Sequence, residues 1–192
     1  MNHLIILAHP NPKSFSTWLT DSITEALVVK GHNVVVRDLY AIGFNPLLSR
    51  SDLASLQKGE IPADIRYEQN LLTEAEEITV IYPLWWDNAP AILRGYFERI
   101  YTNGFAFKYT DKGMVGLLSG KKVRIFTPMG NSYANYEANG GIEIMRRSFD
   151  VCNFETCGME VLYHRYFDNV PSATTEKLQQ YITEAINSYN LD

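Results

Sequence analysis

The chain has 192 residues, of which 46% are hydrophobic and 20% charged, and its formal net charge is −5. This length and composition predict one globular domain, residues 1–192, with enough apolar material for a buried core. The acidic balance and the lack of any long basic run argue against a nucleic-acid partner.

The first ten residues, MNHLIILAHP, have no charged segment before their short apolar run, so they do not predict a signal peptide. No apolar stretch approaches the ~20 residues that a membrane-spanning helix needs. Cys152 and Cys157 are the only cysteines, and the four histidines share no metal-ligand spacing with them. We therefore expect a cytoplasmic protein that does not span a membrane, with reduced thiols and no metal site.

Short β-rich runs alternate with longer helical patterns in the first half of the chain. Apolar runs predict strands at residues 3–8, 33–38 and 78–82, and helical periodicity predicts helices at residues 15–30 and 64–76. Residues 39–60 lack a regular pattern, apart from a possible short helix after Ser49. Gly31 is expected to end the first helix, because glycine adopts the left-handed conformation found there.

The second half continues the alternation. Pro90 should begin a helix, since proline fixes φ and lacks only an N–H that has no partner in a first turn. Residues 102–120 are rich in glycine and aromatic residues and predict a lid or excursion from the main fold. Further strands are expected at residues 122–127 and 159–167, and helices at residues 141–153 and 172–189.

Five strands joined by helices of this length predict parallel pairing with right-handed crossovers. We therefore expect an α/β fold with a doubly wound five-stranded parallel sheet, order 2-1-3-4-5, and helices on both faces. In such a sheet, ligands bind outside the carboxyl ends of the strands, here between strands 1 and 3. Three loops should converge at that point: residues 9–16, 83–89 and 128–139.

The first two of these loops carry unusual residues. His9, Lys13 and Ser14 precede a helix whose N-terminal N–H groups and dipole favour an anion such as phosphate, although Ser14 could serve only as a helix cap. Trp85 and Trp86 stand in the second loop, where two large apolar side chains are unexpected. We interpret them as walls for a planar aromatic ligand, with core packing as the alternative for each.

Two common nucleotide motifs are absent. No G-x-G-x-x-G pattern follows the first strand, so a dinucleotide-binding turn is not predicted. Residues 116–122, GLLSGKK, are one residue too short for a phosphate-binding P-loop and precede a strand instead of following one.

Several segments spread over most of the chain match blocks of one known family. The most specific is Pro83-Leu84-Trp85-Trp86 followed by residues 90–99, PAILRGYFER, which is similar to the family pattern PLxW…PAILKGWFERV. His9 with Ser14-Phe15, residues 38–41 and residues 104–113 also match. The sequence thereby resembles the flavodoxin-like NAD(P)H:quinone oxidoreductases, which include mammalian DT-diaphorase and shorter bacterial drug-activity modulators.

The resemblance implies a flavin-dependent enzyme and a homodimer. Hydride would pass from NAD(P)H to a flavin and then to a quinone or a similar aromatic acceptor, in a two-electron ping-pong reaction. The flavin implied is FAD, with FMN as the alternative, and the choice between NADH and NADPH stays open. Alternative functions are azo or nitro reduction, or a non-catalytic flavoprotein partner such as an ancillary subunit of a potassium-efflux system.

The resemblance also assigns roles to individual positions. Together with Lys13 from the anion argument, the candidate cofactor-binding residues are His9, Ser14, Phe15, Ser16, Pro83, Leu84, Trp85, Trp86, Thr127, Met129, Gly130 and Glu98. The candidate substrate-cavity residues are Trp86, Asp87, Phe107 and Tyr109, with the last two coming from a partner subunit. The candidate catalytic residues are Tyr133 and Tyr136, as donors near the flavin.

The chain departs from the family pattern after the fourth strand. Residues 127–130 read Thr-Pro-Met-Gly where the family usually has Thr-Thr-Gly-Gly, so Met129 should occupy space that the family leaves empty. No histidine lies between Thr127 and Tyr163, and Asp87 stands where an aromatic residue is common. We expect these changes to affect hydride transfer and acceptor range without changing the fold. His164, in the last strand, is expected to be a packed residue.

Overall fold

The computed structural model describes residues 1–191, so Asp192 at the end of the predicted domain lies outside it. Its main sheet contains five strands: β1 (Asn2–Leu7), β2 (Asn33–Asp38), β3 (Glu77–Ile81), β6 (Lys122–Pro128) and β7 (Glu160–Phe167). They lie in the order β2-β1-β3-β6-β7, and every neighbouring pair is parallel. This confirms the predicted fold class and strand order, because β6 and β7 are the fourth and fifth strands of that sheet.

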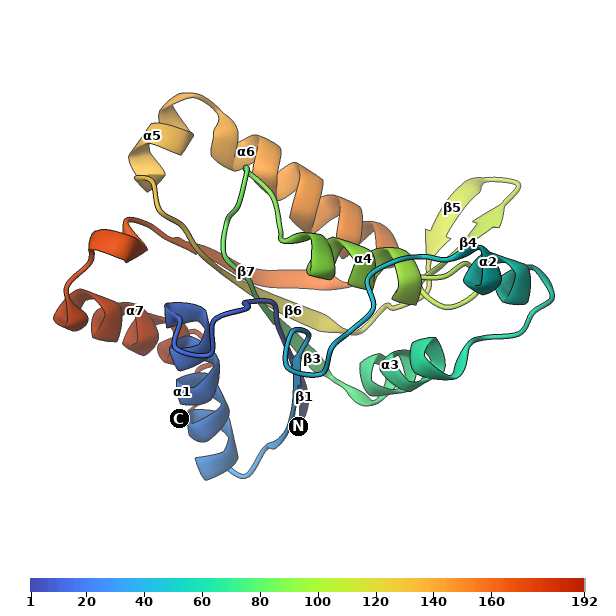
Figure 1. Cartoon of the computed structure of the whole chain (residues 1–192), viewed down its shortest axis with the longest axis horizontal. Helices are drawn as coiled ribbons and strands as arrows, with labels where there is room; N and C mark the ends of the chain where they lie inside the picture. The colour runs from blue at the N-terminus through green and yellow to red at the C-terminus, as the bar shows by residue number, and fades with distance from the viewer. Residues whose placement is uncertain (192) are drawn as a thin grey trace.

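Helices cover both faces of the sheet (Figure 1). Successive residues of a strand point to opposite faces. Thus Ile5 and Leu7 of β1 pack in a cluster with residues of α1 (Phe15–Val29) and α7 (Thr175–Asn187). Leu4 and Ile6 pack in a cluster with residues of α3 (Ala63–Glu74) and α4 (Ala91–Ile100). Burial on both faces explains why β1 reads as an unbroken apolar run.

Several elements differ from the expectation in detail. The loop after β6 contains a short helix, α5 (Tyr133–Ala138), and the helix expected at residues 141–153 consists of α6 (Gly141–Arg146) followed by a π-helical turn, Arg147–Val151. The last helix begins later than expected, because the Thr174 side chain caps it by accepting a hydrogen bond from the Lys177 amide. The short helix after Ser49 is present as α2 (Arg50–Gln57), which Ser49 and Asp52 begin with a capping box.

The excursion at residues 102–120 contains an antiparallel hairpin of β4 (Phe107–Thr110) and β5 (Gly113–Gly116). It follows α4, which returns the chain from the carboxyl ends of the strands to their amino ends. In Figure 1 the hairpin and α2 lie together at one end of the molecule, and α5 lies toward the other. Within residues 1–191, no helix is long and apolar enough to cross a membrane, and no cluster of three or more His, Cys, Asp or Glu residues could hold a metal ion.

A buried histidine pair lies at the amino end of β1. His3 Nε2 is 2.7 Å from Nδ1 of His32, and the buried His3 ring packs edge-to-face with that of Tyr189, at 6.0 Å between ring centroids. Burial, with a smaller contribution from His32, lowers the pKa of His3 from its ordinary 6.5 to about 4. The folded protein therefore keeps His3 neutral at pH values where an unfolded chain protonates it.

This predicts that the free energy of unfolding falls as the pH decreases from 6.5 to 4. Over that window the unfolded chain binds a proton at position 3 that the folded chain does not, which costs up to about 3 kcal/mol. Urea unfolding at half-unit pH steps would measure the slope. His9 and His164 have lowered pKa values too, so His3→Gln should flatten the slope in part. An unchanged slope in His3→Gln would show that His3 is not a source of the acid sensitivity.

Candidate functional site

A cavity of about 290 Å³ opens at the carboxyl ends of the central strands. Residues from all three predicted loops line it, together with a segment after β7 that the sequence did not single out. The lining residues are His9, Phe15, Ser16, Pro83, Leu84, Trp85, Pro128, Met129, Gly130, Val170 and Pro171. The walls are thus mainly apolar and aromatic, as is typical of a site for a flat organic ligand.

The start of α1 gives this cavity one polar end. Ser14 is the N-cap of the helix, and its hydroxyl accepts a hydrogen bond from the Thr17 amide at 3.1 Å. The amides of Phe15 and Ser16, in the first turn, have no carbonyl partner within the helix. Because both residues line the cavity, a ligand anion could take up these donors, and the helix dipole would favour it.

His9 and Lys13 flank the same helix end. The Nδ1 atom of His9 accepts a hydrogen bond from the Asn11 amide at 3.0 Å, and burial lowers the pKa of the ring. A neutral His9 therefore carries its proton on Nε2, where it can act as a donor. Lys13 is exposed and does not line the cavity.

The two tryptophans have different environments. The amides and carbonyls of Trp85 and Asn88 exchange two hydrogen bonds of 3.0 Å, which close a tight turn with Trp86 and Asp87 at its tip. Trp85 lines the cavity, 42% exposed, with its ring centroid 5.8 Å from that of His9. Trp86 is 100% exposed and does not line the cavity. Of the two predicted walls, only Trp85 is in contact with the cavity.

The tip of this turn is strained. Trp86 and Asp87 have φ values of 50° and 56°, in the left-handed region that residues other than glycine, asparagine and aspartate rarely adopt, so the strain lies at Trp86. Two positive φ values in succession are typical of a type I′ turn, which normally carries asparagine or glycine. Strained backbone conformations cluster at active sites and ligand-binding segments, so this turn is a candidate part of the site.

Neither candidate catalytic tyrosine lines the cavity. The Tyr136 hydroxyl donates a hydrogen bond of 2.6 Å to the Asp87 carboxylate, which attaches the tip of the turn to α5. This hydrogen bond is the main reason that the pKa of Tyr136 is raised, so the hydroxyl stays protonated. The Tyr133 amide donates to Asp168 at 3.2 Å, and its side chain lines a different cavity.

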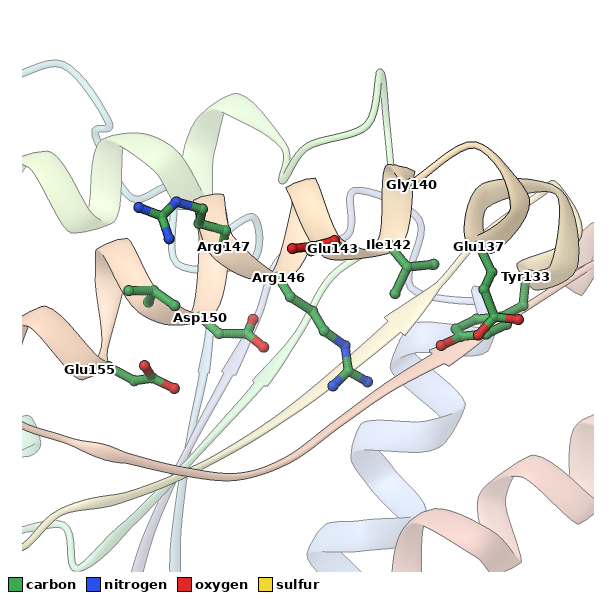
Figure 2. Close-up of a pocket in the computed structure, with 10 residues that line it drawn as sticks. Tyr133, Glu137, Gly140, Ile142, Glu143, Arg146, Arg147, Asp150 and Glu155 are labelled. Atoms are coloured by element: carbon green, nitrogen blue, oxygen red, sulfur yellow. The ribbon is translucent and has the colours of Figure 1, made fainter.

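That second cavity, of about 640 Å³, lies along α5, α6 and the π-helical turn (Figure 2). It is lined by Tyr133, Glu137, Gly140, Ile142, Glu143, Arg146, Arg147, Asp150, Val151 and Glu155. Four of these are carboxylates and two are arginines, so the lining has mixed charge. Tyr133 is the one predicted site residue among them.

Comparisons with known proteins agree with this architecture. A family described as having a flavodoxin-like fold matches residues 1–188. The chain is 38% identical, over 171 residues, to a Haemophilus influenzae protein named as an uncharacterized NAD(P)H oxidoreductase, with 88% of this chain and 85% of that protein covered. It is 32% identical to rat NAD(P)H dehydrogenase [quinone] 1 over 83% of this chain, but spans 65% of the length of that enzyme.

Among solved structures, the NAD(P)H:quinone oxidoreductase from Methanothermobacter marburgensis superposes with a TM-score of 0.87 and 27% identity, covering 100% of this chain and 96% of that one. The chain belongs to the flavodoxin-like NAD(P)H:quinone oxidoreductase family. It is accordingly an oxidoreductase.

The departure from the family pattern at Met129 has a structural explanation. Met129 is buried, and it packs in a cluster with Ile142, Met145 and Tyr166. Its side chain is therefore accommodated largely beneath α6, instead of filling the site as the sequence suggested.

Thr127 is fully buried in β6 and does not line the cavity.

Three other predicted residues of this oxidoreductase lie far from the cavity in their own chain. Glu98 and Phe107 line a groove of about 750 Å³ between α2, the end of α4 and the segment that leads into β4. Tyr109, 73% exposed, lies on the hairpin beside them. Because the hairpin is at the amino ends of the strands, Phe107 and Tyr109 do not line the cavity of their own chain.

Sequence reasoning missed Pro128, Val170 and Pro171. Val170 and Pro171 follow β7, so they also lie at the carboxyl end of a parallel strand. In such a sheet, ligands bind outside the carboxyl ends of the strands, and this rule indicates Val170 and Pro171 when it is applied to the last strand as well as to the inner three.

Proposed function

We propose that the protein is a flavin-dependent NAD(P)H:quinone oxidoreductase that works by a two-step, ping-pong transfer of hydride. The observation that carries this proposal is the cavity beside Trp85, which combines aromatic and apolar walls with an anion-binding helix terminus. A flavin has the same two parts, a flat aromatic ring system and a phosphate. The family membership and the names of the relatives support the same reaction class.

The residues present fit a flavin well. Pro83, Leu84 and Trp85, with the backbone of Met129 and Gly130, would lie along the ring. A Cβ atom added at Gly130 would meet only the Pro171 ring, at 3.8 Å, so this glycine leaves the chain open to a close approach. The amides of Phe15 and Ser16 would hold the phosphate, with His9 and Lys13 adjacent. When bound, the flavin supplies the hydride acceptor and donor that no side chain can replace.

We propose FAD as the cofactor, with FMN as the alternative. At about 290 Å³ the cavity is close to the lower end of typical ligand sites, so it matches the ring and phosphate better than a whole FAD. The adenosine half of FAD would then extend beyond the cavity. Mass spectrometry of the flavin released by heating would decide between the two.

We also propose that the working form is a homodimer. The support is the position of Phe107 and Tyr109, whose rings lie 5.7 Å apart at the end of the chain away from the cavity. In a dimer they could cover the partner's cavity and stack on the aromatic acceptor, with Glu98 beside the same interface. Light scattering of the purified protein tests this arrangement. The cytoplasmic location stays a prediction.

The test of the function is a titration of the purified protein without oxygen. We expect a yellow protein whose visible absorbance bleaches with NADH or NADPH and recovers when a simple quinone is added. A yellow protein that resists both nicotinamides would instead favour an electron carrier or a partner of a transport system. A colourless protein that takes up neither FAD nor FMN would overturn the flavin proposal altogether.

A further inference from the structure

A buried line of hydrogen bonds runs beneath the flavin cavity. His164 of β7 lies between two polar side chains, with its Nδ1 atom 2.7 Å from the Asp150 carboxylate and its Nε2 atom 3.0 Å from the Thr127 hydroxyl. All three residues are buried. Tyr82, which directly follows β3, is also buried, and its amide donates to the Phe126 carbonyl of β6 at 3.2 Å. Tyr166 stacks on the imidazole, with ring centroids 4.2 Å apart, and thereby fixes the plane of the ring.

The donors of this line point in one direction. The Asp150 carboxylate can only accept, so His164 donates from Nδ1 and its Nε2 atom accepts from Thr127. Burial lowers the pKa of His164 even though Asp150 opposes the change, so the ring is neutral, as this arrangement requires. Every member then has a defined orientation.

Thr127, the inner member of the line, and Tyr82, at the end of the neighbouring strand, each stand next to a residue of the cavity wall. Tyr82 precedes Pro83 at the end of β3, and Thr127 precedes Pro128 at the end of β6. The two wall segments are joined by the Leu84 amide, which donates to the Pro128 carbonyl at 2.8 Å. The line therefore ends at β6, and the backbone hydrogen bonds of Tyr82 and Leu84 join β6 to the end of β3 directly below the point where the flavin ring would lie.

Asp150, the outer member, comes from the π-helical turn at Arg147–Val151. Such turns are rare, and they often mark functional sites, because they redirect a side chain out of the regular helical pattern. Asp150 also lines the cavity shown in Figure 2, so solvent reaches this end of the line.

We propose that Asp150 and His164 are positioning residues, which act through Thr127 to hold the end of β6, and the end of β3 that is hydrogen-bonded to it, in the arrangement that binds the flavin. The inference rests on the proposed flavin site, and it assigns no contact between these residues and the cofactor. Its physical basis is that a binding wall keeps its geometry only when the residues behind it are fixed by packing and hydrogen bonds. A purely structural role would affect stability without affecting affinity for the flavin.

Two buried threonines make a matched test. Thr127→Val removes the hydroxyl of the line, whereas Thr79→Val removes an equally buried hydroxyl of β3 that bonds Tyr189 at 2.6 Å, on the opposite face of the sheet. Each apoprotein is titrated with FMN and with FAD, and its free energy of unfolding is measured. We expect Thr127→Val to raise the dissociation constant of each flavin at least about tenfold, which is the size of effect that the loss of one hydrogen bond produces. Thr79→Val should lose as much stability as Thr127→Val does, but it should keep the wild-type affinity for both flavins.

Two further variants complete the experiment. Thr127→Ser keeps the hydroxyl and should restore wild-type affinity, and Asp150→Asn should weaken flavin binding in the same direction as Thr127→Val, even if Thr127→Val does not fold. The visible circular dichroism of the bound flavin should change in Asp150→Asn and not in Thr79→Val. Wild-type affinity and dichroism in both Thr127→Val and Asp150→Asn would overturn this inference and leave the flavin function standing. A wild-type protein that binds neither flavin would overturn the proposed function, and this inference with it.

Discussion

Trp86→Ala should weaken flavin binding at least about tenfold and leave the free energy of unfolding within about 0.5 kcal/mol of wild type. The stability should not change, because the Trp86 side chain is 100% exposed. Its backbone conformation, with φ at 50°, is strained for alanine as well as for tryptophan, so no strain is relieved. Trp86 does not line the cavity of the chain without ligand, so any loss of affinity reports a contact that its exposed ring makes only with the bound flavin.

The magnitude follows from stacking. A base stacked on an aromatic side chain is stabilised by about 1–3 kcal/mol, and about 1.4 kcal/mol is a tenfold change in the dissociation constant. Trp86→Phe should retain part of the affinity. Tyr67→Ala serves as the control, since Tyr67 is an exposed aromatic of α3, which contributes no residue to the cavity. Wild-type flavin content and turnover in Trp86→Ala would show that, of the two tryptophans, only Trp85 can contact the flavin.

The sequence could predict the order of the strands but not which tryptophan lines the cavity. Periodicity and connection length determine a doubly wound sheet, because few topologies satisfy them. The orientations of Trp85 and Trp86, in contrast, depend on a turn whose two tip residues have positive φ, and neither of these is a glycine that would have signalled it. A strained turn at a functional site is the kind of feature that propensity does not predict.

The hydrogen-bonded line beneath the site could not be predicted for a different reason. Thr127, Asp150 and His164 come from three elements, and the pairing of β6 with β7 shifts register between Val123 and Arg124. After such a shift, alternation no longer tells which residues of two strands face one another. His164 was expected to be a packed residue, and its polar partners became apparent only from the tertiary contacts.

Gly95→Ala should destabilise the protein by about 3 kcal/mol, although the same change in an ordinary helix stabilises it by about 1 kcal/mol. Gly95 lies within α4, where a Cβ atom would come 2.2 Å from the Pro46 carbonyl oxygen and 2.4 Å from its Cβ atom. The contact is with backbone, so no side chain can rotate away. The segment that contains Pro46 would have to move as a whole.

Arg99, one turn further along α4, makes that movement costly. Its guanidinium is buried and donates to the Asn45 carbonyl at 3.1 Å and to the carboxylates of Asp52 and Asp64 at 3.2 and 2.7 Å. Moving the segment would stretch these hydrogen bonds, and separating a buried charge from its partners is costly. Urea unfolding of Gly95→Ala measures the effect, with Glu98→Ala, an exposed change on the same helix, as the control.

A rise in stability on Gly95→Ala would mean that the segment around Pro46 yields easily and that α2 is loosely attached to α4. A loss of about 3 kcal/mol would mean instead that α4 is a rigid connection. It begins just after the turn that presents Trp86 and ends at the groove lined by Glu98 and Phe107. In a homodimer, such a helix would hold one chain's cavity and the aromatic residues it offers to its partner at a fixed separation.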